Sequence, residues 1–317
     1  MKKIKIASLL IISLIITLTI LLNIGSNINM DLTYKDIKNP KIKTTNNINI
    51  YYIETAFAKT LEAFTYAGGS PFKMRKISHM AVYITHPKGN FLFDTGLGID
   101  IDKQFKQMQS WFKPFFNYTK TQSAVDVLTQ KGINIDKIFL SHLHWDHASG
   151  IEDFINAEIF TTKEEFKFAK SSKAVPPAFI PSQYDSNKSQ WRFINFKSGP
   201  YEIFKKSLDL YSDGSIVFVP LDGHTHGSIG MFVNLSAEQR FFFTGDLSWT
   251  REGFSKPAEK FYISSILVDD DKSLTKKQVY EVSLLLKHKP EIYVIPSHDS
   301  NAYETLKNIH SLPLLTN

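Results

Sequence analysis

Four side chains that commonly bind metal ions fall within six consecutive residues of this chain, at His142, His144, Asp146 and His147. They follow an apolar stretch that ends at Leu140 and has the pattern of a short buried strand. A loop that leaves a strand allows neighbouring side chains to converge on one point. A random chain of this composition would contain such a cluster in roughly 5 of 10,000 cases. The spacing therefore predicts a metal site at the end of a strand.

Three further candidate ligands, His224, Asp246 and His298, lie in the second half of the chain. Each follows a run rich in β-branched and aromatic residues, which predicts a strand. Strands of an α/β sheet deliver the loops at their carboxyl ends to one edge, where ligand sites form. We therefore expect all seven side chains to meet at one edge of a sheet.

The chain alternates predicted strands and helices from Ile48 onward. The strands are predicted at 48–53, 80–85, 90–93, 137–140, 158–161, 215–220, 229–235, 240–244 and 291–296. The helices are predicted at 122–131, 149–155, 163–170 and 275–287. This alternation predicts an α/β fold with one domain at 48–317, preceded by a linker at 31–47.

Residues 171–206 interrupt this alternation. They contain four prolines among aromatic residues such as Phe179, Tyr184 and Trp191. A long insertion of this kind in a compact domain is often a functional loop. Ordered packing over an apolar surface explains the same composition, so both interpretations stay open.

Residues 1–30 have the pattern of a targeting segment. Three lysines within the first five residues precede an uncharged run that is apolar mainly from Ile6 to Ile24. As a helix, that stretch would span about 28 Å, close to the thickness of a hydrocarbon core. An uncleaved anchor is favoured, with a cleaved signal peptide or a buried helix as alternatives. We expect this segment to engage the membrane or the secretion machinery. Because the lysines stay in the cytoplasm, we expect the remaining chain to be exported, either to the periplasm or to the extracytoplasmic face of the membrane.

Composition excludes several classes of protein. The chain has no cysteine, which excludes disulfides, thiolate metal sites, a catalytic cysteine and a lipoprotein anchor. Its net charge is +6, of which residues 1–30 supply three, so the rest carries +3. This weak bias lacks the basic stripe of nucleic-acid binders, and we expect a small-molecule substrate and no nucleic acid.

Together these motifs resemble the metallo-β-lactamase superfamily over residues 48–300. The resemblance rests on five motifs in the family's order: Phe93-Asp94-Thr95-Gly96, the cluster at 142–147, Gly223-His224-Thr225, Thr244-Gly245-Asp246 and Ser297-His298. It implies an αββα sandwich with the site at one edge of two facing sheets. It also implies two metal ions, with zinc expected from the imidazole and carboxylate ligands and iron, cobalt or manganese as alternatives.

The resemblance also implies a role for each ligand. His142, His144 and His224 would bind one ion, Asp146, His147 and His298 the other, and Asp246 would bridge them. A hydroxide between the ions would attack the substrate, because coordination lowers the pKa of water to about 7. Asp146 and Asp246 are the predicted catalytic residues: Asp246 would carry a proton to the leaving group, and Asp146 would orient the hydroxide.

Three residues are predicted to support the ligands or the substrate. Asp94 is interpreted as a support behind the ligands, with a turn former as the alternative. His226 belongs to the loop behind the site or contacts the substrate. Trp249 stands where lactonase-type relatives usually place a tyrosine, so its indole is interpreted as an apolar wall or as a core residue beneath the site. The remaining histidines, His79, His86, His288 and His310, show no partner pattern and are interpreted as surface residues.

Within the superfamily, the chain is most similar to the lactonase-type branch, which opens acyl-homoserine lactones and related esters. The supporting stretches are 142–150, 244–250 and 295–299. A lactone or ester is therefore the expected substrate, although Trp249 departs from that branch. A class B β-lactamase-type enzyme, a phosphodiester hydrolase and a non-catalytic binding protein on the same fold are the alternatives.

Overall fold

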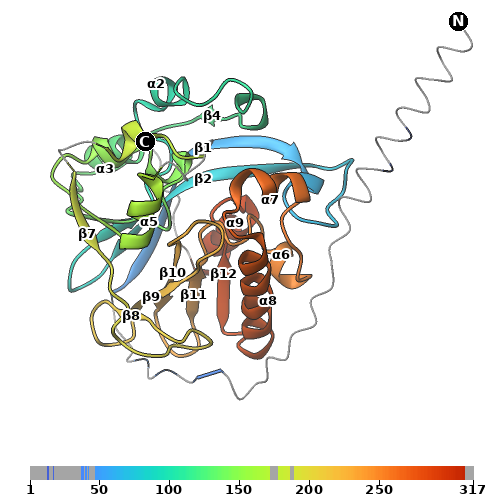
Figure 1. Ribbon diagram of the computed structural model, residues 1–317. Helices are drawn as coiled ribbons and strands as arrows, with labels where there is room; N and C mark the ends of the chain where they lie inside the picture. Colours follow the sequence, from blue (N-terminus) through green and yellow to red (C-terminus); the bar gives the residue numbers. More distant parts are fainter. Residues whose placement is uncertain are drawn as a thin grey trace, which may run out of the picture.

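The computed structural model describes residues 47–171, 178–185 and 189–310, together with Ser13, Thr17, Ile37, Lys38, Pro40 and Ile42 (Figure 1). Nearly all of the predicted targeting segment therefore lies outside the described residues. Within the part that is described, no helix combines the length and the apolar character needed to cross a membrane. Part of the predicted linker touches the domain, since Lys38 N donates a hydrogen bond to Glu202 O at 3.0 Å.

The first of two sheets has seven strands in the order β4-β1-β2-β3-β5-β6-β7. Their bounds are β1 Asn49–Leu61, β2 Met74–Thr85, β3 Phe91–Phe93, β4 Thr119–Lys120, β5 Lys137–Phe139, β6 Glu158–Thr161 and β7 Gln190–Phe193. Strands β4, β1, β2 and β3 pair antiparallel, whereas β3, β5, β6 and β7 run parallel. The parallel half places the loops after β3 and β5 side by side, at 94–96 and at 141–147.

The second sheet has five strands in the order β12-β11-β10-β9-β8. Their bounds are β8 Leu208–Asp209, β9 Ile216–Pro220, β10 Ile229–Asn234, β11 Arg240–Phe243 and β12 Ile292–Ile295. Only β11 and β12 are parallel among these pairs. Every residue of β10 and β11 is buried, which explains why the run Phe241-Phe242-Phe243 is continuously apolar: both faces of the strand are covered.

The two sheets face each other across the main hydrophobic core. Phe93 and Phe139 of the first sheet meet Phe218 and Phe243 of the second, and the rings of Phe139 and Phe218 stack with centroids 4.6 Å apart. Aromatic rings of this size bury a large apolar area each and dominate the energy of such a core. The facing strands are thereby fixed relative to one another, and so are the loops at their ends.

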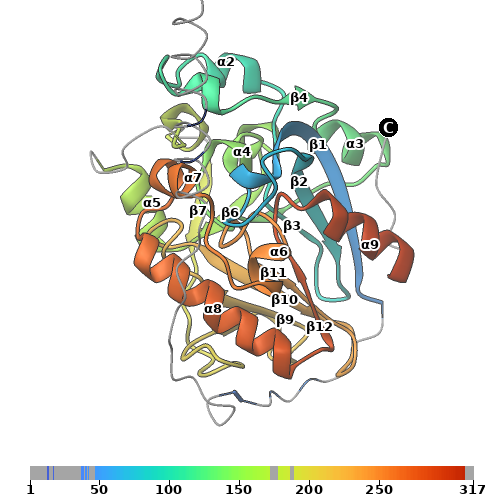
Figure 2. The same ribbon diagram turned by 90° about the vertical axis from the view of Figure 1, so that its right-hand side faces the viewer.

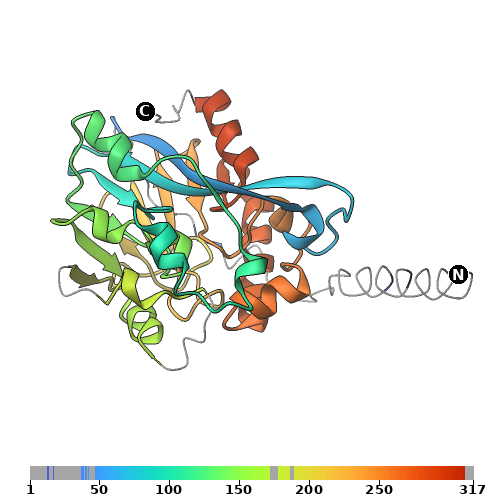
Figure 3. The same cartoon turned by 90° about the horizontal axis from the view of Figure 1, so that it is seen from above.

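Helices cover the outer faces of both sheets (Figures 2 and 3). The helices are α2 Ile101–Phe105, α3 Ala124–Gln130, α4 Trp145–Ala148, α5 Lys163–Ala169, α6 Glu252–Ser255, α7 Tyr262–Val268, α8 Lys272–His288 and α9 Ser300–His310, with 3-10 turns η2 Glu62–Phe64, η3 Lys113–Phe115, η4 Ile151–Asp153 and η5 Pro181–Gln183. Helices α3 and α5 pack on the first sheet, and α8 packs on the second. The expected αββα sandwich is confirmed.

Two predictions about local structure were wrong. The strand predicted at 48–53 continues to Leu61, because β1 and β2 pair along nearly their whole length. The helix predicted at 149–155 is absent: α4 ends at Ala148, and a turn at 149–150 leads into η4. Gly150 N donates to Thr95 Oγ1 at 3.0 Å instead of to a carbonyl oxygen one helical turn earlier, and the chain at Gly150 packs closely on Gly98, where a Cβ would lie 2.6 Å from the Cα of Gly150.

The stretch at 171–206 is partly ordered packing. Strand β7 extends the first sheet, Trp191 packs in the core beneath α5, and Phe204 packs on the second sheet. Residues 172–177 and 186–188 lie outside the described residues. The described part therefore favours the packing interpretation, except at Phe179, whose ring lies 4.7 Å from that of His144.

Candidate metal centre

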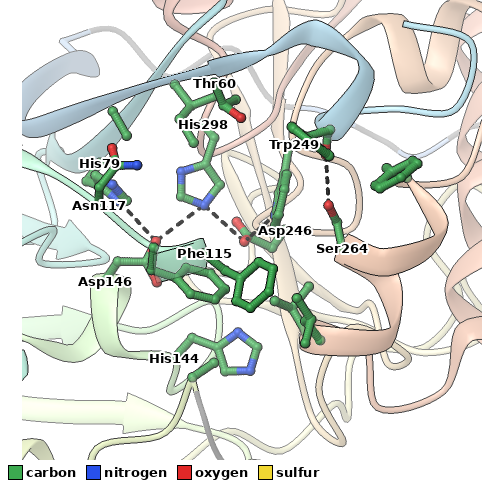
Figure 4. Close-up of a pocket in the computed structure, with 18 of the residues that line it drawn as sticks. Thr60, His79, Phe115, Asn117, His144, Asp146, Asp246, Trp249, Ser264 and His298 are labelled. Atoms are coloured by element: carbon green, nitrogen blue, oxygen red, sulfur yellow. Dashed lines mark hydrogen bonds and ion pairs between the residues drawn. The ribbon is translucent and has the colours of Figure 1, made fainter. Parts of the chain in front are cut away.

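The structure brings all seven predicted ligands together at the ends of the two sheets. Figure 4 shows four of them, His144, Asp146, Asp246 and His298. His142 and His144 lie on the loop after β5, and Asp146 and His147 lie in the short helix α4. The other three follow strands of the second sheet: His224 comes after β9, Asp246 after β11 and His298 after β12. All seven side chains are buried. Two sheets that differ in sequence and strand order thus each supply part of one cluster.

The candidate ligand atoms form three overlapping groups, and within each group they lie within 4.8 Å of one another. The groups are His142 with His144 and His224; His142 with His147 and Asp246; and Asp146 with His298 and His79. The first group matches the set expected for one ion. The second and third groups together contain the residues expected for the other ion and for the bridge. The third group also contains His79, which was not predicted as a ligand.

Partners outside the cluster hold the imidazole rings in place. His147 Nδ1 lies 2.8 Å from Asp94 Oδ2, His224 Nδ1 lies 2.8 Å from Asp269 Oδ1, and His298 Nδ1 lies 2.8 Å from the carbonyl oxygen of Ser78. Because carboxylate and carbonyl oxygens only accept, each Nδ1 carries the hydrogen. Each Nε2 is then left to face the centre of the cluster with its lone pair. Metal-binding histidines are usually held in this way.

Asp94 occupies an unusual backbone conformation to make its contacts, with a φ of 58°. Its Oδ1 accepts the backbone N–H of Ser141 at 2.7 Å, and its Oδ2 accepts the Ser141 hydroxyl at 2.7 Å as well as His147 Nδ1. A non-glycine residue in the left-handed region is held there by its surroundings. Asp94 therefore ties the loop after β3 to the loop that carries the histidines.

The charges of the cluster suit cations. Burial, with the neighbouring histidines, lowers the pKa of His142 and His144 well below the ordinary value, so both rings are neutral. Burial alone would raise the pKa of Asp246, but His298 and His147 hold it well below its usual range. His142 and His144 thus offer neutral imidazoles and Asp246 an ionised carboxylate, the forms that bind metal ions. Although burial alone would lower it, the pKa of both His147 and His298 is raised by the nearby Asp246, and a bound ion would displace the extra proton.

Two atoms at the middle of the cluster have no hydrogen-bond partner among the described residues, namely His147 Nε2 and Asp246 Oδ1. They lie 3.3 Å apart. Nearby, His142 Nε2 and His224 Nε2 lie 3.1 Å apart. Buried polar atoms without a partner are costly unless an ion or water satisfies them. The donor set therefore fits the two divalent ions that the sequence predicts.

His79 was missed as a member of this cluster. It was interpreted as a surface residue, but it is buried in β2, and its Nδ1 lies 2.9 Å from Asp146 Oδ2. His79 lies near the middle of the long strand β2 and not in a loop after a strand, so no local motif marks it in the sequence. His86 is also buried, away from the cluster, where it stacks on Tyr211 at 4.1 Å. His288 is exposed as expected, and the side chain of His310 lies outside the described residues.

Two buried charged groups behind the cluster were also missed. Glu165 Oε1 accepts the N–H of Leu143 at 2.7 Å, and its Oε2 accepts the Thr225 hydroxyl at 2.6 Å, so it joins the two loops that carry the first ligand group. Lys260 Nζ lies 2.7 Å from Asp269 Oδ1, the oxygen that holds His224. Neither residue belongs to a recognisable motif.

A pocket of about 540 Å³ opens above the cluster. Asp146, Asp246 and His298 lie at its base, with Trp249 and Phe115 beside them (Figure 4). Its walls are mostly apolar and come from the end of the β1–β2 hairpin, the segment around η3, and α7. His226 lies outside this pocket lining: it is exposed, stacks on Phe168 and lies 3.4 Å from Asp270. Its position matches the loop interpretation rather than substrate contact.

The two-sheet sandwich with buried His and Asp groups at its edge is the arrangement of a metal-binding protein whose donor groups suit two ions. Comparison with known families identifies which one: the chain belongs to the Metallo-beta-lactamase superfamily, whose model matches residues 75–298. The resemblance stated from the motifs is thereby confirmed.

Lactonases are prominent among the similar proteins. The N-acyl homoserine lactonase AttM of Rhizobium radiobacter is 25% identical over 232 residues, which cover 71% of this chain and 82% of that protein. A structure of an N-acyl homoserine lactone hydrolase with N-hexanoyl-L-homoserine at its metal centre matches with a TM-score of 0.63 at 16% identity, covering 83% of this chain and 97% of that one. The dizinc quorum-quenching lactonase AidC matches with a TM-score of 0.57 at 20% identity, covering 82% and 90%.

Proposed function

We propose that this hydrolase opens a lactone or an ester with a large apolar acyl group, and that its two ions are zinc. The observation that carries the proposal is the position of the ligands at the base of an apolar pocket. Asp146 and Asp246 line the same cavity as Phe115, Trp249 and Leu267. A carbonyl group placed at the ions would leave its acyl part against these apolar walls. The lactonase relatives, and the acyl-homoserine product in one similar structure, support the same substrate class.

The ligand set assigns each residue a task. A pair of divalent ions would supply Lewis-acid polarisation and an activated water at neutral pH. His142, His144 and His224 would hold one ion, while Asp146, His147 and His298 would hold the other. Asp246 would lie between them, because its Oδ1 lies 3.3 Å from His147 Nε2 of one set and its Oδ2 lies 3.6 Å from His224 Nε2 of the other.

Hydrolysis requires one proton to move from water to the leaving oxygen. Asp246 takes one proton of the attacking water and passes it to the alkoxide when the acyl–oxygen bond breaks, giving an alcohol and a carboxylic acid, which releases its own proton to solvent at neutral pH. Asp146 orients the water through its free oxygen. The hydrogen bond from His79 fixes the other oxygen of Asp146.

A hydrolysis panel tests the proposal on the zinc-loaded protein. The panel contains lactones and aryl esters with graded acyl chains, a phosphodiester and a β-lactam, with Asp246→Asn as the inactive control. We expect kcat/KM to be highest for lactones or esters and to rise with acyl length. Fastest turnover of the phosphodiester or the β-lactam would contradict the proposal. Two bound ions without any turnover would instead support a non-catalytic binding protein.

We also propose that the chain is exported and that residues 1–30 act as an anchor or a signal peptide. The support is the sequence alone: three lysines followed by a long uncharged apolar run. A reporter enzyme that is active only outside the cytoplasm, fused after residue 317, tests this orientation. Reporter activity only outside is the expected result, and a soluble full-length fusion in the cytoplasm would overturn the proposal.

A further inference from the structure

Exposed apolar side chains gather at the mouth of the pocket. We define the pocket rim as residues 59–74, 105–117 and 261–268, three segments that each contribute residues to the pocket lining. Eight of the eleven large hydrophobic side chains exposed among the described residues lie in this rim. They include Phe72, which is 88% exposed, and Phe115, which is 58% exposed. Exposed apolar side chains concentrated around one pocket are typical of a binding site.

The rim and the pocket form one continuous apolar surface. Phe64, Met74, Phe115 and Ile263 are exposed and also line the cavity. The hairpin end and α7 are held together, because Ser264 Oγ donates to the carbonyl oxygen of Phe64 at 3.0 Å. A molecule bound on the rim therefore has direct access to the base of the pocket, where the ligands lie.

The rim is also basic. It contains four lysines, Lys59, Lys73, Lys106 and Lys113, and a single acidic residue, Glu62, which gives a net charge of +3. Glu62 is buried and pairs with Lys73 at 2.9 Å. Lys59 and Lys106 are exposed beside the apolar side chains. Aromatic and aliphatic side chains flanked by lysines are typical of surfaces that lie on anionic membranes.

A second copy of the chain fits this surface less well than a bilayer does. In a symmetric dimer the same patch occurs on both subunits, so one rim of charge +3 would face another. Like charges across an interface disfavour association. An anionic lipid surface, in contrast, complements the lysines and accepts the apolar side chains. Charge complementarity therefore favours lipid as the occupant.

We propose that the pocket rim docks on a bilayer that contains anionic phospholipid, so that the pocket opens toward the lipid. A lipophilic substrate would then enter from the membrane; this route rests on the proposed function, whereas docking does not. The predicted apolar segment at 6–24 would reinforce docking. Only twelve residues separate it from Ile37, and fully extended they span about 40 Å, which would keep the domain near the surface.

Site-specific labelling of the full-length protein in vesicles tests the docking surface. The chain has no cysteine, so a single introduced cysteine carries the only dye. We would label Phe72→Cys and Ile266→Cys in the rim, with Ile155→Cys as the matched control, since Ile155 is 72% exposed but lies outside the rim. The vesicles contain phosphatidylglycerol, phosphatidylcholine and a nitroxide-labelled lipid that quenches nearby dyes.

We expect at least about twofold stronger quenching at the rim positions than at Ile155. Equal quenching at all three positions would overturn the proposal. It would mean that the domain shows no preferred face to the lipid and is held at the membrane by the segment at 6–24 alone. Shielding of the rim dyes without lipid, together with a dimeric mass, would overturn it in favour of a second copy. Neither readout uses substrate, so an inactive protein would contradict the proposed function and leave the docking result intact.

A charge reversal tests the electrostatic part. Lys59→Glu with Lys106→Glu changes the rim from +3 to −1, and should reduce rim quenching several-fold on anionic vesicles. The matched control is Lys131→Glu with Lys163→Glu, two exposed lysines outside the rim. Equal loss in both double variants would contradict a specific role for the rim.

Discussion

Trp249 Nε1 donates a hydrogen bond to Asp246 Oδ2 at 2.9 Å. The same oxygen lies 3.0 Å from His298 Nε2, so the indole and the imidazole lie on two sides of the carboxylate. The rest of the ring lines the pocket. The sequence suggested an apolar wall or a core residue, but the indole N–H also positions the predicted bridging carboxylate. Trp249 therefore joins the substrate pocket to the metal centre.

Substitution at Trp249 should separate these two tasks. Trp249→Phe keeps an apolar ring but removes the donor, and should lower kcat about tenfold because a hydrogen bond to a charged group is lost. Trp249→Ala also removes the wall, and should raise KM most for long acyl chains. Steady-state kinetics on a graded acyl series, with a melting curve for each variant, measures both effects. If Trp249→Ala lowers the melting temperature and leaves the KM ranking unchanged, the residue is a core residue only.

Asp246→Asn should affect chemistry more than folding. The amide keeps the shape of the side chain but cannot carry the proton and bridges ions weakly. We expect kcat to fall at least about 10²-fold, the usual scale for lost acid–base catalysis. Single-turnover kinetics measures it, and Asp136→Asn, at an exposed position, is the matched control. Activity within a few-fold of the wild type would disprove the assigned role.

Metal content should approach two ions per chain. Removal of the ions should destabilise the fold, because the ions bind only the folded state. Without them, buried atoms such as His147 Nε2 have no partner. With free metal at about 1,000 times the Kd, one site contributes about 4 kcal/mol, which corresponds to a melting shift of roughly 10 °C for a domain of this size. Elemental analysis and melting curves with and without chelator measure both quantities. Metal content near zero after reconstitution would refute the dinuclear site.

The ligands could be predicted from the sequence because each follows a strand directly. His142, Asp246 and His298 belong to short local motifs, and parallel strands bring such loops to one edge. The two-sheet arrangement came from the family resemblance rather than from periodicity. Strand β1 was predicted eight residues too short because its continuation pairs along a long hairpin whose partner could not be recognised locally.

The residues behind the ligands could not be predicted, for a common physical reason. His79, Glu165 and Lys260 reach the site from a strand centre, a helix and a loop, and each is defined by a partner distant in sequence. Glu165, for example, binds Leu143 and Thr225, which lie 22 and 60 residues away. Hydrophobic patterns report which residues are buried, but they do not report which polar group a buried charge will meet.

Lys260 should determine how well His224 binds metal. Its ammonium pairs with Asp269 at 2.7 Å, and Asp269 holds the His224 ring. Lys260→Met leaves a buried carboxylate without its cation, so we expect about 3–5 kcal/mol of lost stability. Metal affinity should fall about 10–100-fold, as for other residues that orient metal-binding histidines. Denaturant unfolding and metal titration measure these changes.

A double variant distinguishes stability from orientation. Lys260→Met with Asp269→Leu removes both charges and should recover much of the stability but not the metal affinity. The surface pair of Lys170 and Asp185, 2.6 Å apart, provides the control, and Lys170→Met should change neither quantity measurably. Full recovery of metal affinity in the double variant would show that Asp269 does not orient His224.

Glu165 should make stability depend on pH. Burial raises its pKa from 4.5 to about 7, although Thr225 and two backbone N–H groups donate to it. Between these values the folded state holds more protons than the unfolded state, so the free energy of unfolding falls as pH rises. The loss amounts to about 3 kcal/mol across the window. Urea unfolding of the metal-free protein at pH 4.5 and 7.5 should give a smaller decrease for Glu165→Gln than for the wild type. Glu152→Gln, at an exposed position, should retain the wild-type slope. Equal slopes for all three proteins would mean that Glu165 is ionised in the folded state throughout, held by its three donors.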